Sequence, residues 1–172
     1  GELFGGQSSL MRLSGWTWED MLLEPGVALQ VNWPRTRDSD SELRQLKDLL
    51  DEARAYLLAR KASPETTPRN LRLEALEEVL EGNRPLMVKA DQLDEIEAAV
   101  AFAMWQKLKI VILGGYDAPL CAPLLREYDV PVIVSAVHRL PLRQNDPYDA
   151  PFTLPERLRH AKVEFCIAGD GR

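Results

Sequence analysis

The chain has 172 residues, 45% of them apolar and 28% charged, which are ordinary proportions for a globular protein and exclude collagen-like or largely disordered chains. Its 27 acidic and 21 basic residues leave a net charge of −6, so we expect no binding to nucleic acid or to an anionic membrane surface. The longest apolar run, residues 109–113, is far shorter than the roughly 20 residues that cross a bilayer. Cys121 and Cys166 lack CxxC spacing, and we expect both to be small buried side chains.

Residues 1–35 form a less regular lead-in. The pattern predicts short strands at 10–13 and 26–33, the second ended by Pro34, with a turn and one helical turn over 16–21. Trp16, Trp18 and Trp33 either form one wall of a pocket or pack in a core or interface, and packing is the favoured interpretation. The first residues include no Met and no basic segment, so we expect a piece of a longer protein, whose compartment stays open.

Residues 36–83 form a helical segment. Ser39 and Glu42 make a capping-box pattern, and leucines recurring at helical spacing predict an amphipathic helix over 41–60. After a loop with two prolines, Asn70 is expected to cap a shorter helix that ends at Gly82-Asn83.

Residues 84–172 alternate between strands and helices. Apolar strands are predicted at 85–90, 109–113, 131–137 and 163–168, and helices at 91–108, 117–127 and 153–161, the last from a capping box of Thr153 and Glu156. This alternation predicts an α/β fold with a parallel sheet buried on both faces. We expect one domain over 1–172, built as part of a TIM-barrel-like (β/α)8 fold, because a whole barrel needs about 250 residues.

The candidate functional residues lie where these strands end, since parallel sheets carry reactive groups at their carboxyl ends. Lys89 interrupts an apolar strand and is suited to act as a base, a Schiff-base amine or an anion clamp, or else pairs with Asp91 or Asp170. The pair Gly114-Gly115 before a helix resembles a phosphate cradle, although a tight turn explains it equally well.

Further candidates follow the later strands. His138 and Arg139 could clamp a carboxylate or be solvated loop residues, and Asp170 could accept or deliver a proton. With two histidines and no HxH, we expect no zinc site and no other bound metal within this chain.

Several segments together resemble a known family. They are Leu10–Asp20, Asn32-Trp33-Pro34, Arg84–Asp91 with Asp94-Glu95-Ile96, Ile110–Gly115, Val130–Val134, Leu154–Leu158 and Ala161–Phe165. Their order and spacing are similar to strands five to eight, and the segment before them, of amidohydrolases related to imidazolonepropionase. That family combines a metal-dependent (β/α)8 barrel with a small β-sandwich and hydrolyses C–N bonds, often in cyclic amides.

The resemblance implies roles for individual residues. Asp170 matches the aspartate that takes a proton after strand eight, whereas Lys89 and Gly114 stand where typical members carry metal-binding histidines. We therefore expect an amidohydrolase parent with a reduced site and a divalent metal such as zinc, and no activity in this chain alone. Asp170 and Lys89 are the expected catalytic residues, and the expected substrate-binding residues are Trp33, Tyr116, His138 and Arg139.

Two expectations complete the analysis. The alternative function is a non-catalytic α/β domain that holds a small anionic ligand through Lys89, the Gly114-Gly115 turn and His138-Arg139. Self-association into a homo-oligomer is expected through exposed sheet edges.

Overall fold

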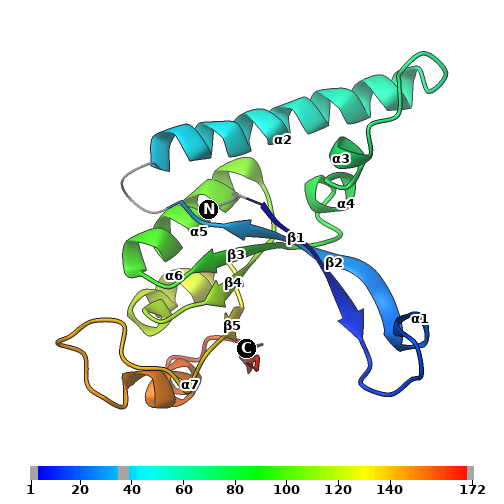
Figure 1. Cartoon of the computed structure of the whole chain (residues 1–172). Helices are drawn as coiled ribbons and strands as arrows, with labels where there is room; N and C mark the ends of the chain where they lie inside the picture. The colour runs from blue at the N-terminus through cyan, green and yellow to red at the C-terminus, as the bar shows by residue number, and fades with distance from the viewer. Residues whose placement is uncertain (1–3, 35–38, 170–172) are drawn as a thin grey trace. The chain divides into compact units, whose positions relative to one another are not determined.

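The computed structural model describes residues 4–34 and 39–169, with the side chains of Phe4, Ser39 and Asp40 left out of the description. The chain divides into two compact units, Gly1–Leu86 with Lys107–Lys109, and Met87–Gln106 with Ile110–Arg172 (Figure 1).

The first unit opens with an antiparallel hairpin of β1 (Phe4–Met11) and β2 (Leu22–Asn32), whose turn carries the short helix α1 (Trp18–Met21). The strand predicted over 26–33 lies, except for its last residue, within the longer β2, whereas the one predicted over 10–13 overlaps only the last two residues of β1. β2 includes Pro25, which has no amide to donate. The strand tolerates this residue because the hydrogen-bond ladder between β1 and β2 is irregular at that point. The Thr17 side chain caps α1 by accepting a hydrogen bond from the amide of Asp20 at 3.3 Å.

The helices of the first unit largely follow the expected pattern. α2 (Ser39–Ala62) confirms the helix predicted over 41–60, and its buried side chains include Leu46, Leu50 and Ala53. The side chain of Ser39, half of the expected capping box, lies outside the described residues. No described helix has the length and apolar character that a membrane crossing requires.

The shorter helix begins at its predicted cap but is divided in two. Asn70 accepts hydrogen bonds from the amides of Arg72 and Leu73, at 3.1 and 3.4 Å. A 3-10-type hydrogen bond, from the Leu76 amide to the Leu73 carbonyl three residues earlier, lies between α3 (Leu71–Glu74) and α4 (Glu77–Leu80).

The second unit is an α/β layer of parallel strands, in the order β3 (Leu86–Ala90), β4 (Ile110–Gly114), β5 (Val132–Val134) and β6 (Phe165–Ile167). β4 pairs in parallel with β5, and β5 with β6. β3 and β4 also run parallel. The Leu86 amide donates to the Lys109 carbonyl at their amino ends, and the Gly115 amide donates to the Ala90 carbonyl at their carboxyl ends. The predicted mixed α/β class with mostly parallel strands is therefore confirmed.

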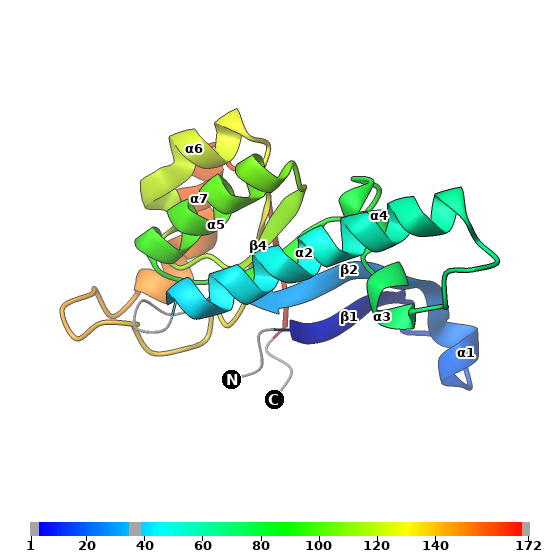
Figure 2. The same cartoon turned by 90° about the horizontal axis from the view of Figure 1, so that it is seen from above.

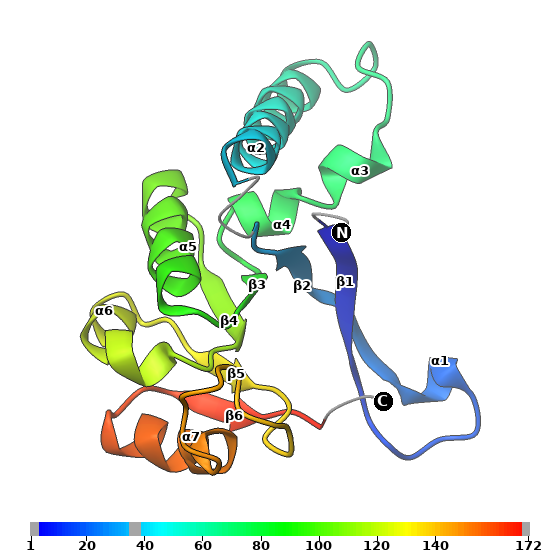
Figure 3. The ribbon, with the colours of Figure 1, turned by 60° about the vertical axis from the view of Figure 1, so that its left-hand side comes forward.

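Helices cover one face of these strands. In Figures 2 and 3, α5 (Leu93–Gln106), α6 (Ala122–Glu127) and α7 (Ala150–His160) lie on the same side of the strands, and the 3-10 turn η1 (Ala118–Cys121) precedes α6. Burial alternates accordingly: Ile110 and Ile112 are buried, while Val111 and Leu113 are only half-buried. The expectation of a sheet fully buried on both faces is thus wrong for the described residues, because helices of this unit cover only one of its faces.

Three further sequence expectations need correction. β5 ends at Val134 rather than 137, since Ala136 takes a left-handed conformation (φ 55°) that interrupts the strand. α7 starts at Ala150, three residues before the expected capping box, and the Thr153 hydroxyl instead donates to the Asp149 carbonyl at 3.1 Å within the first turn. Cys121 is buried as expected, whereas Cys166 is exposed.

Candidate functional site at the carboxyl ends of the parallel strands

The turn after β4 is built from two glycines in left-handed conformations, Gly114 (φ 109°) and Gly115 (φ 68°). A Cβ on Gly114 would lie 2.7 Å from Asp91 Oδ1, and one on Gly115 would lie 2.5 Å from Val132 Cγ1. Both positions therefore exclude any larger residue.

The amides of this turn are bonded within the protein. Gly115 donates to the Ala90 carbonyl at 2.8 Å, Tyr116 to Asp91 Oδ1 at 3.3 Å, and Asp117 to the Asp91 carbonyl at 2.9 Å. Because a phosphate cradle needs free amides pointing at the ligand, the tight-turn interpretation of Gly114-Gly115 is the one this geometry favours.

The start of α5 is likewise occupied. The Glu95 carboxylate reaches back to accept from the amides of Asp91 and Gln92, each at 3.1 Å, and Asp117 Oδ2 accepts from the Leu93 amide at 3.1 Å. The helix is thus capped by Glu95 and by Asp117 of the next βα turn, and it begins at Leu93 rather than at residue 91 as expected.

Asp91 instead binds Arg139, from the loop after β5. Arg139 Nη2 lies 3.1 Å from Asp91 Oδ1 and Nη1 lies 3.4 Å from Oδ2, while the guanidinium sits 5.1 Å from the centre of the Tyr116 ring. This half-buried pair joins the end of β3 to the β5–α7 loop, residues 135–149. Arg139 and Tyr116, both predicted substrate contacts, are brought together, with Tyr116 buried beneath the guanidinium.

A second pair ties the same loop to the end of β4. Both guanidinium Nη atoms of Arg143 bind the carboxylate of Asp117, which is only 6% exposed. The hydrogen bond to Asp117 raises the pKa of Arg143 above its ordinary value. Asp146 completes the connection, because its Oδ2 accepts from the Tyr116 hydroxyl at 2.8 Å and from the Arg143 amide at 3.0 Å.

We call these six residues the carboxyl-edge network; they are Asp91, Tyr116, Asp117, Arg139, Arg143 and Asp146. Burial is the main cause that raises the pKa of the Tyr116 hydroxyl, with its bond to Asp146 acting in the same direction. The arrangement sets two guanidinium groups against three carboxylates, which leaves one negative charge in excess, and it holds the β5–α7 loop on the strand ends.

Lys89 stands apart from this network. It lies on β3 between the buried Val88 and Ala90, so strand alternation places it on the face that α5, α6 and α7 do not cover. Its side chain is exposed and makes no ion pair with another described residue. Of its two expected partners, Asp91 is bound to Arg139 and Asp170 lies outside the described residues. Lys89 is therefore an available cation near the carboxyl end of β3.

The remaining predicted site residues have separate environments. His138 is exposed and packs edge-on against the ring of Phe152 in α7, with centroids 5.7 Å apart. Trp33 is buried in the first unit, whereas Trp16 and Trp18 in the same unit are exposed, so the three tryptophans share neither a core nor a wall. Asp170 lies outside the described residues.

Sequence reasoning missed the roles of Asp117, Arg143 and Asp146. Asp117 appeared only as a helix opener, and the two loop residues had no pattern of their own. One signal was present: an acid two residues after a Gly-Gly turn at a strand end, with two arginines four residues apart in the loop after the next strand.

The described residues do not fit a metal centre at this edge. They contain no group of three or more His, Cys, Asp or Glu side chains that could hold an ion, and the carboxylates of Asp91 and Asp117 are bound to arginines.

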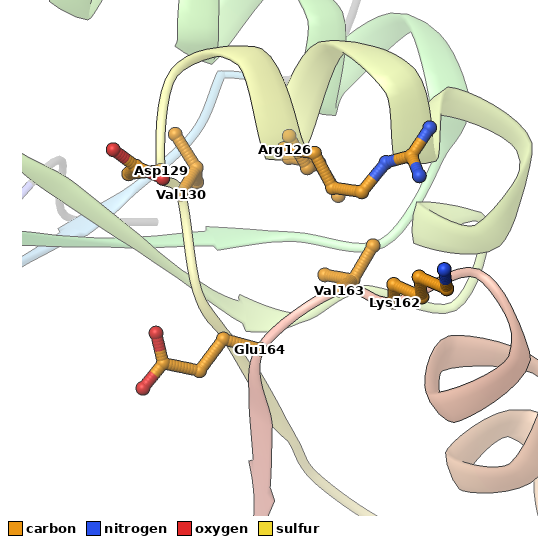
Figure 4. A pocket seen from close by; sticks show the side chains of 7 residues that line it. Arg126, Asp129, Val130, Lys162, Val163 and Glu164 are labelled. Carbon is orange, nitrogen blue, oxygen red and sulfur yellow. The ribbon is translucent and has the colours of Figure 1, made fainter.

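A shallow cavity of about 220 Å³ opens near the amino ends of β5 and β6 (Figure 4). Its walls come from the segments before these strands and combine Arg126 and Lys162 with Asp129 and Glu164. It lies at the end of the strands opposite to the carboxyl-edge network, and in parallel α/β folds that end serves stability.

Comparison with known proteins shows that this chain is similar in fold to a solved structure. No protein-family model matches the chain, and a search of curated proteins finds no significant match. A crystal structure of an amidohydrolase from Thermotoga maritima MSB8 matches with a TM-score of 0.83 at 17% sequence identity, over 96% of this chain and 47% of that one. The chain thus has an amidohydrolase-like fold and spans about half the length of the structure it matches.

Proposed function

We propose that this chain is part of an amidohydrolase-type hydrolase, related to imidazolonepropionase, that cleaves a non-peptide C–N bond such as that of a cyclic amide. The observation that carries the proposal is the likeness of 96% of the chain to an amidohydrolase structure. In this proposal the parallel strands β3–β6 form part of a (β/α)8 barrel, and reaction takes place at their carboxyl ends.

Lys89 and Asp170 are the residues proposed to act on substrate. Addition of water to the amide carbon places negative charge on the carbonyl oxygen, and an ammonium such as that of Lys89, which forms no ion pair with the described residues, stabilises such a charge. Asp170 accepts the proton of the attacking water and returns it to the nitrogen as the C–N bond breaks. The products are a carboxylic acid and an amine, joined in one molecule when the substrate is cyclic.

The carboxyl-edge network supports this site by positioning the β5–α7 loop. The Nη atoms of Arg139 and Arg143 are bound to Asp91 and Asp117, so the charge of each guanidinium is already compensated, and the buried Nε of Arg139 has no hydrogen-bond partner among the described residues. The alternative of a simple anion-binding domain is therefore less well supported than the hydrolase. Because the chain spans about half of the matching structure, we propose that it has no hydrolase activity alone.

The test uses the full-length protein that contains this chain, beside the chain itself. Ring opening and amine release are measured on a panel of cyclic and linear amides, together with the metal content of the purified protein. We expect turnover by the full-length protein only, lost in Asp170→Asn and reduced in Lys89→Ala. Lys109→Ala is the matched control, since Lys109 is an exposed lysine at the amino end of the neighbouring strand.

Two results would contradict the proposal. A folded full-length protein without turnover on the whole panel excludes the hydrolase function. Unchanged kcat and KM in Lys89→Ala, beside an active wild type, exclude the role of Lys89 while leaving the reaction class in place.

A further inference from the structure

The tip of the β1–β2 hairpin, residues 10–24, is the most exposed apolar region described in the first unit. Leu13 is 100% exposed, Trp16 97% and Trp18 63%, and Leu10, Met11 and Leu23 are also exposed. In Figures 1 and 3 this tip, marked by α1, lies away from α2, α3 and α4 of the same unit. Nothing in its own unit covers it.

The tip is nevertheless an ordered structure. The Arg12 amide donates to the Met21 carbonyl at 2.8 Å, the Arg12 Nε donates to the Asp20 carbonyl at 3.0 Å, and Thr17 caps α1. These bonds hold the two tryptophans on a fixed turn. Presenting them to a partner therefore costs little additional conformational entropy.

The exposed area is large enough for a stable interface. With about 250 Å² as the surface of a large aromatic side chain, the two tryptophans alone leave on the order of 400 Å² open. With the exposed leucines and the methionine added, the exposed apolar area of the tip approaches the roughly 800 Å² that each partner buries in a standard interface. The largest apolar patch of a typical monomer is about 300–600 Å², so a tip of this size is typical of an interaction surface.

The charges around the tip favour a second copy of this chain as the partner. Arg12 carries a positive charge and Glu19 and Asp20 carry negative charges, and none of the three forms an ion pair with a described residue. In a two-fold interface the same patch meets itself, so a surface with an apolar centre and unpaired charges of both signs is self-complementary.

We propose that the chain forms a two-fold homodimer through this hairpin tip, with Leu13, Trp16 and Trp18 at the centre and Arg12 of each copy facing Glu19 of the other. This surface differs from an exposed sheet edge. β1 has irregular register at three places, and such irregularities oppose the addition of a further strand. Side chains of the tip, and not strand pairing, provide the contacts.

Sedimentation equilibrium of the full chain over a range of concentrations tests the proposal. We expect a reversible monomer–dimer equilibrium, and a dissociation constant raised roughly 30-fold or more in the double variant Leu13→Ser/Trp16→Ser, which corresponds to about 2 kcal/mol. The matched control, Leu58→Ser/Trp105→Ser, removes one leucine 70% exposed and one tryptophan 64% exposed elsewhere on the chain, and should leave the constant unchanged. Circular dichroism verifies that each variant is folded.

Charge reversal tests the two-fold geometry separately. Arg12→Glu should weaken the dimer, and adding Glu19→Arg should restore it, because the two reversed charges face each other again across the axis. A wild type that stays monomeric at the highest soluble concentration, or a tip variant that dimerises like the control, overturns the proposal. A charge-reversed double variant as weak as Arg12→Glu overturns the two-fold pairing.

Discussion

Replacing Asp117 tests whether the carboxyl-edge network stabilises the fold. In Asp117→Ala the Leu93 amide loses its acceptor, a helix-cap loss of about 1 kcal/mol. The two charge-assisted bonds to Arg143 are lost as well, but Arg143 is 45% exposed and returns partly to water, so they add only about 1–2 kcal/mol. We expect the free energy of unfolding to fall by about 2–3 kcal/mol.

The companion variants separate the two contributions. Asp117→Asn retains an oxygen for the Leu93 amide but lacks the negative charge, so its loss should be about half as large. Asp94→Ala removes an exposed acid from the first turn of the same helix and should cost a few tenths of a kcal/mol. Urea unfolding followed by circular dichroism gives all three values. If Asp117→Ala loses no more stability than Asp94→Ala, the network does not support the fold in the way described.

Three further outcomes are expected. Gly115→Ala should lower the free energy of unfolding in urea by about 2–4 kcal/mol, because the backbone is left-handed and the new methyl group overlaps Val132. Gly82→Ala, at a left-handed position in open space, should lower it by about 1 kcal/mol, and equal losses in the two variants would contradict this reasoning. A thiol reagent should modify the exposed Cys166 rapidly and Cys121 only after unfolding, because burial raises the pKa of Cys121 to about 11; equal rates would refute it. Because the pKa of Tyr116 is raised in the folded state, the hydroxyl proton is lost first from the unfolded chain, and the free energy of unfolding should decline as pH rises above about 10. Tyr116→Phe should reduce that decline. A variant with the same pH profile as the wild type would show that this hydroxyl does not contribute.

Local signals in the sequence were sufficient to predict most elements. The leucines of 41–60 recur at the helical period, Asn70 caps its helix, and the apolar runs at 85–90 and 109–113 are strands. Periodicity and capping involve only neighbouring residues, so they can be recognised in one sequence. The errors occurred at boundaries, where Ala136 ends β5 early and Thr153 falls inside α7, because several local patterns compete there.

The candidate site could be predicted only in part. The sequence correctly placed Lys89 and Gly114-Gly115 near strand ends and Arg139 after β5. The spacing of residues along the chain did not show which side chains they contact. Asp91 and Arg139 are 48 residues apart, and Asp117 and Arg143 are 26 apart. Which acid pairs with which arginine depends on the lengths of β5 and its following loop, and no short-range pattern encodes those.

The sequence by itself thus determined the α/β alternation, the positions of the candidate residues near strand ends and the resemblance to amidohydrolases. The tertiary structure alone decided that Trp16 and Trp18 are exposed while Trp33 is buried, and that Asp91 binds Arg139 rather than Lys89. The physical reason is that burial and ion pairing depend on which distant segments meet. Hydrophobic spacing determines local conformation, whereas the environment of a side chain is set by the packing of elements far apart in the chain.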